Sequence, residues 1–493
     1  MRVRRTVLVI GSGGAGLTAA VFAARNGADV YVASKVPCGR NSSTMFSGGV
    51  FTLASGSVAP DVHFERTMKA GCHVNDPSLV RVLVDEAEVS LKELCSLGMG
   101  IRFPRDGMAS VRHTSVHKLM GGEGFLSQMS RYARSIGVKF IDYSSATRLL
   151  FDDRKVVGAE IVNWRTRKGC LFSADSIVIA TGGGGQIFKR TDNPARVTGD
   201  GYALAADAGL PLIGMEFTQF YPLGWDDPAL PVWMADLSLI DSLPLTDASG
   251  NEFLLAQLKE WGLKNGVEGN LYARDRSAAA IARVARDGGA WLHFECADDS
   301  LWDDKAFFRA LIINKERFRK LRRPVRVEPL EHYFCGGIKI DAECRTGIDG
   351  LYACGEVTGG VDGANRIGGN ALANIVTFGR RAGRNAATGE ARHVSERTRG
   401  TEAPRFSGHV NPDDVRKELQ DVVWRGLGPL RTEAGIKEVL QFIDEHEGIE
   451  PGTTSPHDYL EALELHGLFV TARAVARGAL ARKESLGVHF RTD

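Results

Sequence analysis

The segment TVLVIGSGGAGLTAAVFAARNGADVYVASK, residues 6–35, decides the fold predicted for this chain. A short β-branched run precedes GSGGAG, an amphipathic helical stretch follows it, and a second apolar run closes the segment. Gly11, Gly13 and Gly16 have the spacing of a dinucleotide-binding turn, in which glycines allow a tight turn, the approach of a pyrophosphate and close helix packing. The pattern therefore predicts a Rossmann-like strand–helix–strand unit.

The end of this unit departs from the pattern of plain NAD-binding proteins. In those proteins an acidic residue at the end of the second strand binds the ribose, whereas Ser34 and Lys35 stand here. A lone glycine motif is a weak signal, but its position between a strand and a helix at the start of the chain strengthens it. A nucleotide cofactor is therefore expected, and simple NAD binding is disfavoured.

A second glycine-rich segment, GLYACGEVTGGVDGANRIGGNALANIVTFGRRAG (350–383), lies near the other end of the chain. Nine of its 34 residues are glycine, and Glu356, Arg366 and Asn370 lie among them. Glycine at this density lets a ligand approach the backbone, and the apolar run after GGN predicts a helix whose first N–H groups face an electron-rich group. The segment is an irregular loop or part of a cofactor site, and the N-terminal turn favours the site.

Charge and composition exclude several classes of protein. The chain has 493 residues with 61 basic and 60 acidic side chains, so no basic field draws it to nucleic acid or to an anionic membrane. No run of about 18 apolar residues occurs, which argues against direct membrane insertion. The charged start and apolar residues 7–10 resemble a signal peptide, but this run is too short and leads directly into the glycine turn. We therefore expect a cytoplasmic protein.

The cysteines and histidines show no metal-binding pattern. The eight cysteines are scattered without a CxxC pair, which predicts reduced, packed thiols and neither a zinc site nor an iron–sulfur cluster. His113 and His117 lie close together in the sequence but lack an obvious third ligand. We expect no metal in this chain, so any iron–sulfur relay must come from a partner.

Composition also divides the chain into units. Tryptophan and aspartate become frequent from residue 223, and glycine-rich sequence resumes at HYFCGGIKID. A polar segment with proline and glycine, residues 396–410, predicts a linker before a helical end. The predicted division is therefore one interrupted domain, an inserted domain and a helical C-terminal domain, at residues 1–222 with 332–395, 223–331 and 411–493.

Several motifs together resemble one flavoprotein family. They span nearly the whole chain: VIGSGGAGLTAA, ASKVPCGRNSST, VIATGGGGQIF, TGDGYALAADAG, MEFTQFYP, YARD, EHYFCGGI, residues 350–383 and LARKESLGVHFRTD. In this order they resemble the fumarate reductase, succinate dehydrogenase and L-aspartate oxidase flavoproteins, which commonly have Ser-Lys after the second strand. The resemblance implies an α/β fold with a Rossmann-like FAD-binding domain, interrupted by an α+β capping domain and followed by a C-terminal helical domain.

The resemblance also implies which residues bind FAD. The glycine turn would hold the pyrophosphate, Ser34 and Lys35 would lie near the adenosine, and Glu356 would bind the ribityl chain. The helix that starts at Asn370 would face the flavin ring and stabilise negative charge on its reduced form. The implied cofactor residues are Gly11, Ser12, Gly13, Gly14, Ala15, Gly16, Ser34, Lys35, Ser42, Ser43, Thr44, Gly49, Thr181, Asp200, Glu356, Asn370, Ala371 and Leu372.

The same comparison bears on how FAD is held. Members of the family with covalent flavin carry a histidine in the loop that corresponds to residues 41–44. Ser42 and Ser43 occupy that loop here. We therefore expect non-covalent FAD.

For the substrate, the resemblance implies three residues. Arg274 of YARD would donate a proton to the substrate carbon opposite flavin N5, and Asp275 or Glu252 would reload it, since an arginine is protonated at neutral pH. His332 and Arg366 would bind substrate carboxylates, and a guanidinium suits a carboxylate because it offers two parallel hydrogen bonds. Without the resemblance, Arg274 could equally form an ion pair at a helix start.

The chain departs from the family pattern around this substrate site. Tyr221 in QFYP replaces a substrate-binding histidine, and counting without gaps places Ala235 and Asp236 on a Thr-Glu pair and residues 239–242 on Arg-Gly-Glu-Gly. Residues 484–487 have the sequence Glu-Ser-Leu-Gly where the family has Glu-Ser-Arg-Gly. A site with unmatched polar groups rejects the wrong ligand, so these losses favour a substrate with an altered distal end.

The function expected from the resemblance is FAD-dependent interconversion of an unsaturated and a saturated dicarboxylate, of the fumarate–succinate kind, by hydride transfer at flavin N5. Two alternatives stay open. One is an L-aspartate oxidase, and the other is an electron-transfer flavoprotein subunit with an iron–sulfur partner, peripheral to a membrane through partner subunits. A non-enzymatic glycine-rich binding protein is disfavoured because so many motifs coincide.

Overall fold

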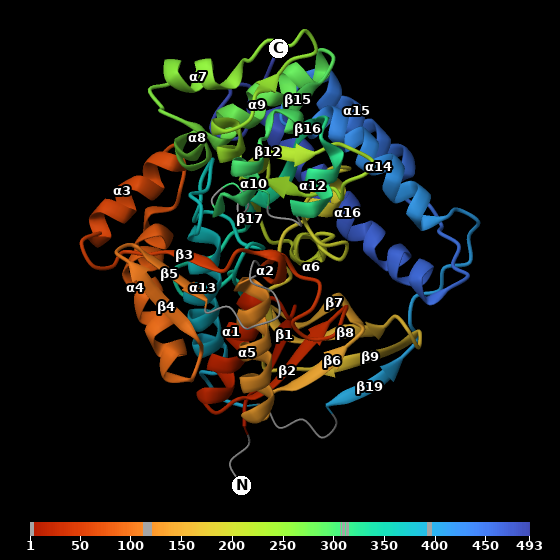
Figure 1. The fold of residues 1–493 in the computed structure, drawn as a ribbon. Helices are drawn as coiled ribbons and strands as arrows, with labels where there is room; N and C mark the ends of the chain where they lie inside the picture. The colour runs from red at the N-terminus through yellow and green to blue at the C-terminus, as the bar shows by residue number, and fades with distance from the viewer. Residues whose placement is uncertain (1–3, 112–120, 306, 308–310, 312–314, 392–396) are drawn as a thin grey trace.

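The computed structural model describes residues 4–111, 121–305, 307, 311, 315–391 and 397–493 (Figure 1). His113 and His117 lie outside the described residues. Within those ranges no group of three or more His, Cys, Asp or Glu side chains is placed to hold a metal ion. No helix in the described part of the chain is both long enough and apolar enough to cross a membrane.

The centre of the largest domain is a parallel sheet with the strand order β18-β10-β1-β2-β6. β1 pairs with both β2 and β10, and β18 extends the sheet beyond β10. Because carboxyl ends of parallel strands share one edge of a sheet, the two glycine-rich segments meet there. The strands are β1 (Thr6–Ile10), β2 (Asp29–Ser34), β6 (Lys139–Asp142), β10 (Ser176–Ile179) and β18 (Leu351–Ala353).

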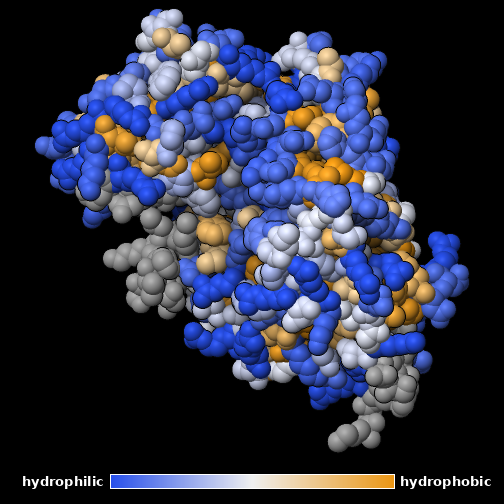
Figure 2. Space-filling model, turned by 90° about the vertical axis from the view of Figure 1, so that its right-hand side faces the viewer, coloured by the Kyte–Doolittle hydropathy of each residue, from blue (hydrophilic) through white to orange (hydrophobic). Residues whose placement is uncertain are grey.

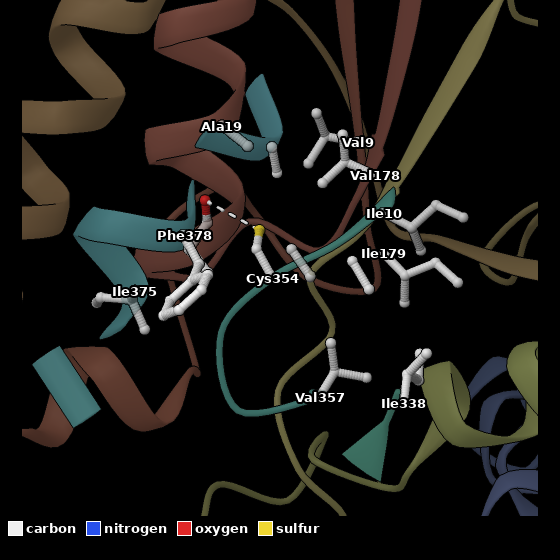
Figure 3. Close-up of a cluster of buried hydrophobic side chains, with 14 of the residues drawn as sticks. Val9, Ile10, Ala19, Val178, Ile179, Ile338, Cys354, Val357, Ile375 and Phe378 are labelled. Atoms are coloured by element: carbon white, nitrogen blue, oxygen red, sulfur yellow. Dashed lines mark hydrogen bonds between the residues drawn. The ribbon is translucent and has the colours of Figure 1, made fainter. Parts of the chain in front are cut away.

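Two helices, α1 (Gly14–Arg25) and α13 (Asn370–Ala386), pack against this sheet and against each other. They approach closely because a Cβ on Gly379 of α13 would lie only 2.8 Å from the Ala15 carbonyl oxygen of α1. In Figure 3, Ile375 and Phe378 of α13 lie beside Cys354, in the same buried cluster as the strand residues. Further helices of this domain are α3 (Pro60–Ala70), α4 (Pro77–Ser96), α5 (Gly121–Ser135) and α6 (Asp200–Asp207).

Three smaller sheets flank this core. An antiparallel sheet in the order β19-β9-β8-β7 includes β19 (Thr398–Thr401), which lies inside the segment expected to be a linker. That expectation is wrong for these four residues, because the backbone of β9 pairs with them along its open edge. The other strands of this sheet are β7 (Ser144–Asp152), β8 (Lys155–Asn163) and β9 (Lys168–Ser173). The second sheet has the order β3-β5-β4 and consists of β3 (Val50–Thr52), β4 (Ile101–Arg105) and β5 (Met108–Val111). The third pairs β11 (Leu212–Ile213) with β17 (Gly337–Ile338).

The capping domain is built on a separate antiparallel sheet in the order β13-β12-β16-β15-β14. It has its own core, in which the buried rings of Trp225, Phe294 and Phe318 pack together. The strands are β12 (Thr218–Trp225), β13 (Met234–Ala235), β14 (Leu245–Thr246), β15 (Ala290–His293) and β16 (Pro324–Phe334); the helices are α7 (Leu254–Glu260), α8 (Gly266–Tyr272), α9 (Arg274–Arg286), α10 (Asp299–Asp303) and α12 (Lys315–Leu321).

β12 and β16 carry the chain into and out of the capping domain, and they pair with each other. The boundaries expected at 222/223 and 331/332 fall within these two strands. The exact division of the chain stays a prediction. The pairing of β12 with β16 shows that the residues where the chain enters and leaves the capping domain lie side by side.

The C-terminal helical domain consists of α14 (Pro412–Leu427), α15 (Glu433–His446) and α16 (Pro456–Ala481). The three helices pack on one another, and α16 also packs against α6 of the largest domain. Figure 2, which views the molecule from the side where these helices lie in Figure 1, shows a mostly hydrophilic face with apolar residues in patches.

Candidate active site

A cavity opens where the carboxyl ends of β1 and β2 meet the second glycine-rich segment. Its walls come from parts of the chain that are far apart in sequence, as a dinucleotide site at this edge requires. The lining residues are 10–15, 33–36, 40–44, 144–146, 180–182, 196–197, 200, 354, 356 and 375.

The three turn glycines play different parts in this wall. Gly11 has a φ of +108°, and a Cβ there or on Gly16 would collide with backbone carbonyl groups of Ala180 or of Gly11 itself. A Cβ on Gly13 would have only Ser42, 3.7 Å away, as its nearest neighbour. Gly11 and Gly16 are thus needed for packing, whereas Gly13 keeps the cavity open.

The first turn of α1 provides the donors for an anionic ligand. Its N-cap is Gly13, which has no side chain to cap the helix, and the Gly14 N–H donates to the Thr44 hydroxyl at 3.2 Å. The remaining first-turn N–H groups have no acceptor within the helix, and the helix dipole favours negative charge there. This donor set fits a pyrophosphate.

A second feature of the cavity also fits a polar cofactor. The Thr181 hydroxyl is buried and has no hydrogen-bond partner among the residues that the structure describes. A buried hydroxyl without a partner costs free energy, and a bound ligand in the cavity would remove that cost. The residues present therefore fit FAD.

One end of the cavity is a network of charges. The Lys35 ammonium donates to Thr198 at 2.7 Å and contacts carboxylate oxygens of Asp200 at 2.8 Å and Glu464 at 2.6 Å. Lys35, expected near the adenosine, and Asp200, expected to help hold FAD, thus lie together. Glu464, which belongs to α16, was not foreseen from the sequence.

Glu356 lies in the wall of the cavity with its carboxylate buried. One of its oxygens accepts a hydrogen bond from the Phe334 N–H at 3.1 Å. Burial raises the pKa of this carboxyl to about 7. Glu356 can therefore carry or release a proton near neutral pH, in a position where a ligand hydroxyl would be its neighbour.

Five of the expected cofactor residues do not line the cavity: Gly16, Gly49, Asn370, Ala371 and Leu372. Gly49 packs on Gly121, where a Cβ would lie 2.7 Å from the Gly121 Cα. The side chain of Asn370 points to α3, where it hydrogen-bonds His63 at 3.0 Å. Asn370 still begins α13, so the helix start lies where it was expected.

Sequence reasoning missed several lining residues. Ser144, Ser145 and Ala146 come from β7, and Arg196 comes from the loop before α6. Their segments carry no glycine motif, and an alternating strand pattern does not reveal which side chains face a cavity. The available signal in the sequence was the position of Arg196, two residues before the TGDG motif that contains Asp200.

The expected substrate residues also come together. Arg274 begins α9, Arg366 lies within the second glycine-rich segment, and both guanidinium groups contact the Gln219 side-chain oxygen, at 3.5 and 3.0 Å. The Gln219 amide in turn donates to Asn365 and to the Arg366 carbonyl oxygen. Gln219, fully buried in β12, therefore links the two arginines, and it was not foreseen.

Tyr221 and His332 form the adjoining part of this cluster. The Arg274 guanidinium lies 4.8 Å from the centre of the Tyr221 ring, and the centres of the Tyr221 and His332 rings are 5.3 Å apart in an edge-to-face arrangement. His332 Nδ1 hydrogen-bonds an Asp192 carboxylate oxygen at 2.7 Å. Burial lowers the pKa of His332; Asp192 opposes this, while Arg366 and Arg274 add to it.

A short chain of hydrogen bonds leads from Arg274 to an acid. The Arg274 Nε–H donates to the Asn270 oxygen at 3.3 Å, and the Asn270 amide donates to Asp236 at 3.1 Å. Burial lowers the pKa of Arg274, and the neighbouring Arg366 lowers it further. Glu252, one of the two acids expected to serve Arg274, has an exposed side chain and pairs across the strand ladder with Thr246.

Residues 6–372 match the FAD binding domain family, and residues 416–493 match the family described as fumarate reductase flavoprotein C-term. A fumarate reductase (CoM/CoB) subunit from Methanothermobacter marburgensis is 33% identical over 99% of this chain and 94% of that protein. The chain belongs to the fumarate reductase, succinate dehydrogenase and L-aspartate oxidase flavoprotein family. It is an FAD-dependent oxidoreductase of that family.

Other relatives agree with this placement. The L-aspartate oxidase of Streptomyces coelicolor is 29% identical over 99% of this chain and 88% of that protein. The solved structure "Mycobacterium smegmatis Sdh1 in complex with UQ1" has a TM-score of 0.83 at 28% identity and covers 100% of this chain and 89% of its own. The fold class expected from the sequence is confirmed.

Where this member of the flavoprotein family departs from the expected motif, the structure shows what stands instead. Tyr221, predicted to replace a family histidine, is buried, and Ala235 and Asp236 lie where β13 ends. Leu486 packs in an apolar cluster with Ala364, two residues before Arg366. The arginine lost from the C-terminal motif is thus replaced by an apolar contact behind the substrate loop.

Proposed function

We propose that this flavoprotein interconverts an unsaturated and a saturated carboxylate, with the fumarate–succinate dicarboxylate pair as the reference. The observation that carries the proposal is the pair of guanidinium groups on Arg274 and Arg366, held together by Gln219. Two arginines at one point suit a carboxylate, because each offers hydrogen bonds and positive charge. The start of α13 lies next to them, since only residues 367–369 separate Arg366 from Asn370 and a Cβ on Gly368 would lie 3.6 Å from the Arg274 guanidinium.

FAD, when bound, would accept or donate a hydride at N5. The chain's own residues would do the rest: Arg366 and His332 orient the substrate, and Arg274 exchanges a proton with the substrate carbon. Burial and the charge of Arg366 lower the pKa of Arg274, which makes its guanidinium a better proton donor.

Arg274 must regain its proton after each turnover. The hydrogen bonds run from Arg274 to Asn270 and from Asn270 to Asp236, so they orient the guanidinium and balance its charge. Asp236 lies in the position where counting from the sequence placed a family glutamate. We assign Asp236 the positioning of Arg274 through Asn270, and Asp275, whose pKa burial raises and which lies within the electrostatic reach of Arg274, stays the acid proposed to reload it.

We further propose that FAD is held without a covalent bond. Ser43 donates a hydrogen bond to Asn193 at 2.9 Å, and Ser42 caps the short helix α2 (Ser43–Phe46). Neither serine offers the imidazole nitrogen to which the family attaches flavin. Acid precipitation should therefore leave the yellow colour in solution, and colour retained by the pellet would contradict this part of the proposal.

The proposal is tested by titrating the FAD absorbance of the purified protein with a panel of dicarboxylates. A true substrate should perturb the flavin spectrum, because the capping domain closes on it and excludes water. The reduced protein should then be reoxidised by the unsaturated acid. A panel without any spectral change or turnover would reject this function.

Two alternatives differ in class and in test. An L-aspartate oxidase would produce hydrogen peroxide from L-aspartate, and similarity to the Streptomyces coelicolor enzyme favours keeping that assay. An electron-transfer subunit is favoured by relatives named as subunits. In that case an iron–sulfur partner would supply the cluster, and co-purification with such a partner from the native host would support it.

A further inference from the structure

The distal end of the substrate site has an unusual hydrogen-bonding state, set by the contact between Asp192 and His332. Asp192 is 9% exposed, and its carboxylate oxygen lies 2.7 Å from His332 Nδ1. A carboxylate only accepts hydrogen bonds, so Nδ1 must carry the proton in this contact. The tautomer of His332 is thereby fixed by its neighbour.

The other ring nitrogen of His332 then has the opposite character. Burial, Arg366 and Arg274 keep the imidazole neutral, because they lower its pKa more than Asp192 raises it. A neutral ring with the proton on Nδ1 has a lone pair on Nε2. Nε2 of His332 can therefore accept a hydrogen bond but cannot donate one to a carboxylate.

The charges around the site support the same conclusion. Arg274 and Arg366 provide two positive charges, and Asp192 and Asp236 already lie within their electrostatic reach. A substrate with one carboxylate can still be bound by the arginine pair. A second carboxylate beside Asp192 and His332 would meet a negative charge and an acceptor, and both disfavour it.

Tyr221 completes this end of the site. Its ring lies between Arg274 and His332 and is 5% exposed. Burial raises the pKa of the phenol, with Asp236 as a further cause and a hydrogen bond with Asn270 opposing them, so its hydroxyl keeps the proton and stays neutral. The neutral Tyr221 and the acceptor on His332 Nε2 thus match a neutral group that has a donor, such as an amide.

We propose that the substrate carries a single carboxylate, bound by Arg366 with the proton donor Arg274 beside it, and at its other end a neutral group with an N–H or O–H donor that bonds His332 Nε2. The proposal rests on the proposed carboxylate chemistry of this site and narrows its substrate class. It places the reaction among oxidoreductions of 2-enoates whose far end is an amide or a hydroxyl.

Three acids of closely similar size test this on the FAD-loaded protein. Fumaramate has a carboxamide at its far end, (E)-4-oxo-2-pentenoate has a methyl ketone there, and fumarate has a second carboxylate. We expect fumaramate to bind about tenfold or more tightly than either of the others, measured as a dissociation constant from the flavin absorbance change.

The outcomes separate two claims. Equal binding of fumaramate and the methyl ketone, or tightest binding of fumarate, would overturn the inference and leave the carboxylate function standing. If none of the three acids perturbs the flavin or is reduced, the proposed function itself fails, and the inference fails with it.

The variant Asp192→Asn tests the cause. An asparagine at 192 can donate to Nδ1, which lets His332 carry its proton on Nε2 and removes a negative charge, so binding of fumarate relative to fumaramate should rise by about tenfold. Asp207→Asn is the matched control, since Asp207 pairs with His466 at 2.9 Å far from the substrate cluster. An unchanged ratio in a folded Asp192→Asn variant would contradict the role of Asp192.

Discussion

Single side chains in the substrate cluster are held by specific partners and not by general packing. Arg274 is linked on one side to Asn270 and on the other to Gln219, and its guanidinium covers the face of Tyr221. A lysine cannot reproduce this arrangement, because its ammonium is a compact charge on a flexible stem, whereas the guanidinium is a planar fork. The chemistry proposed for this residue therefore depends on its shape as much as on its charge.

Arg274→Lys should retain FAD and lower turnover of any accepted acid by about 10²- to 10⁴-fold, the usual range for loss of a positioned proton donor. The measurement is kcat with the best substrate found by flavin titration. Arg276→Lys is the control, because its guanidinium lies over the Trp261 ring instead of in the substrate cluster. Turnover that survives in Arg274→Lys would remove Arg274 from the mechanism.

Glu356→Gln should change how stability depends on pH. Burial raises the pKa of Glu356 from its usual 4.5 to about 7, so the native state holds this proton more tightly than the unfolded state does. The parent protein should therefore lose stability as pH rises from about 4.5 to about 7, by up to about 3 kcal/mol from this group.

Urea unfolding of the FAD-free protein at pH 5 and pH 8 measures this effect. The stability of Glu356→Gln relative to the parent should increase between the two values. Glu402→Gln, whose side chain is 87% exposed, should show no such change. Parallel pH curves for the parent and Glu356→Gln would show that the carboxyl has an ordinary pKa.

At the level of elements, the turn between β1 and α1 has two separate functions that neighbouring glycines divide between them. Gly16 lets α1 lie against the carbonyl group of Gly11, and Gly13 leaves the helix start open to the cavity. The glycine spacing in the sequence does not reveal whether a given glycine is needed for packing or for ligand binding. Substitution by alanine separates the two.

Gly16→Ala should destabilise the protein by about 3 kcal/mol or more, because the new Cβ meets backbone that cannot move aside. Gly13→Ala should stay within about 1 kcal/mol of the parent, since Gly13 has an ordinary extended backbone. Its FAD affinity should nevertheless fall by tenfold or more, because the methyl group enters the cavity. Chemical unfolding and FAD titration measure the two effects, and a Gly13→Ala protein with normal FAD affinity would contradict the assignment.

Across the whole molecule, the C-terminal helical domain is joined to the cofactor site by buried charges. Glu464 of α16 contacts Lys35 and Arg196, each at 2.6 Å, and Arg416 of α14 contacts Glu461 at 2.6 Å. When one partner of such a buried ion pair is removed, the other charge stays buried without compensation, and the folded protein loses stability. The helices after the linker therefore form part of the support of the FAD cavity.

Glu464→Gln should lower the free energy of unfolding by about 3 kcal/mol and weaken FAD binding, since Lys35 and Arg196 lose a shared partner at the edge of the cavity. Glu447→Gln is the control: Glu447 also pairs with an arginine, but its side chain is 74% exposed, and a change within about 0.5 kcal/mol is expected. Equal effects of the two substitutions would show that the buried network does not support the site.

Much of the fold and part of the site could be predicted from the sequence. The strand–turn–helix pattern of residues 6–35 and the second glycine-rich segment predicted the parallel sheet, and the motifs predicted the capping and helical domains. Thirteen of the expected cofactor residues line the cavity, counting from Gly11 through Glu356. The strand β19 could not be predicted, because polar residues 398–401 are a strand only through pairing with β9.

The sequence by itself determined a nucleotide-binding α/β unit through its glycine spacing and apolar periodicity, and FAD through its resemblance to a flavoprotein family, because such motifs are local properties that survive without knowledge of distant contacts. The tertiary structure alone decided which polar groups face one another: Gln219 between Arg274 and Arg366, Asp192 on His332, and Glu464 on Lys35. Each of these pairs joins residues far apart in the chain. Proton positions and charge depend on such neighbours, so the substrate's far end is determined by the folded site and not by a motif.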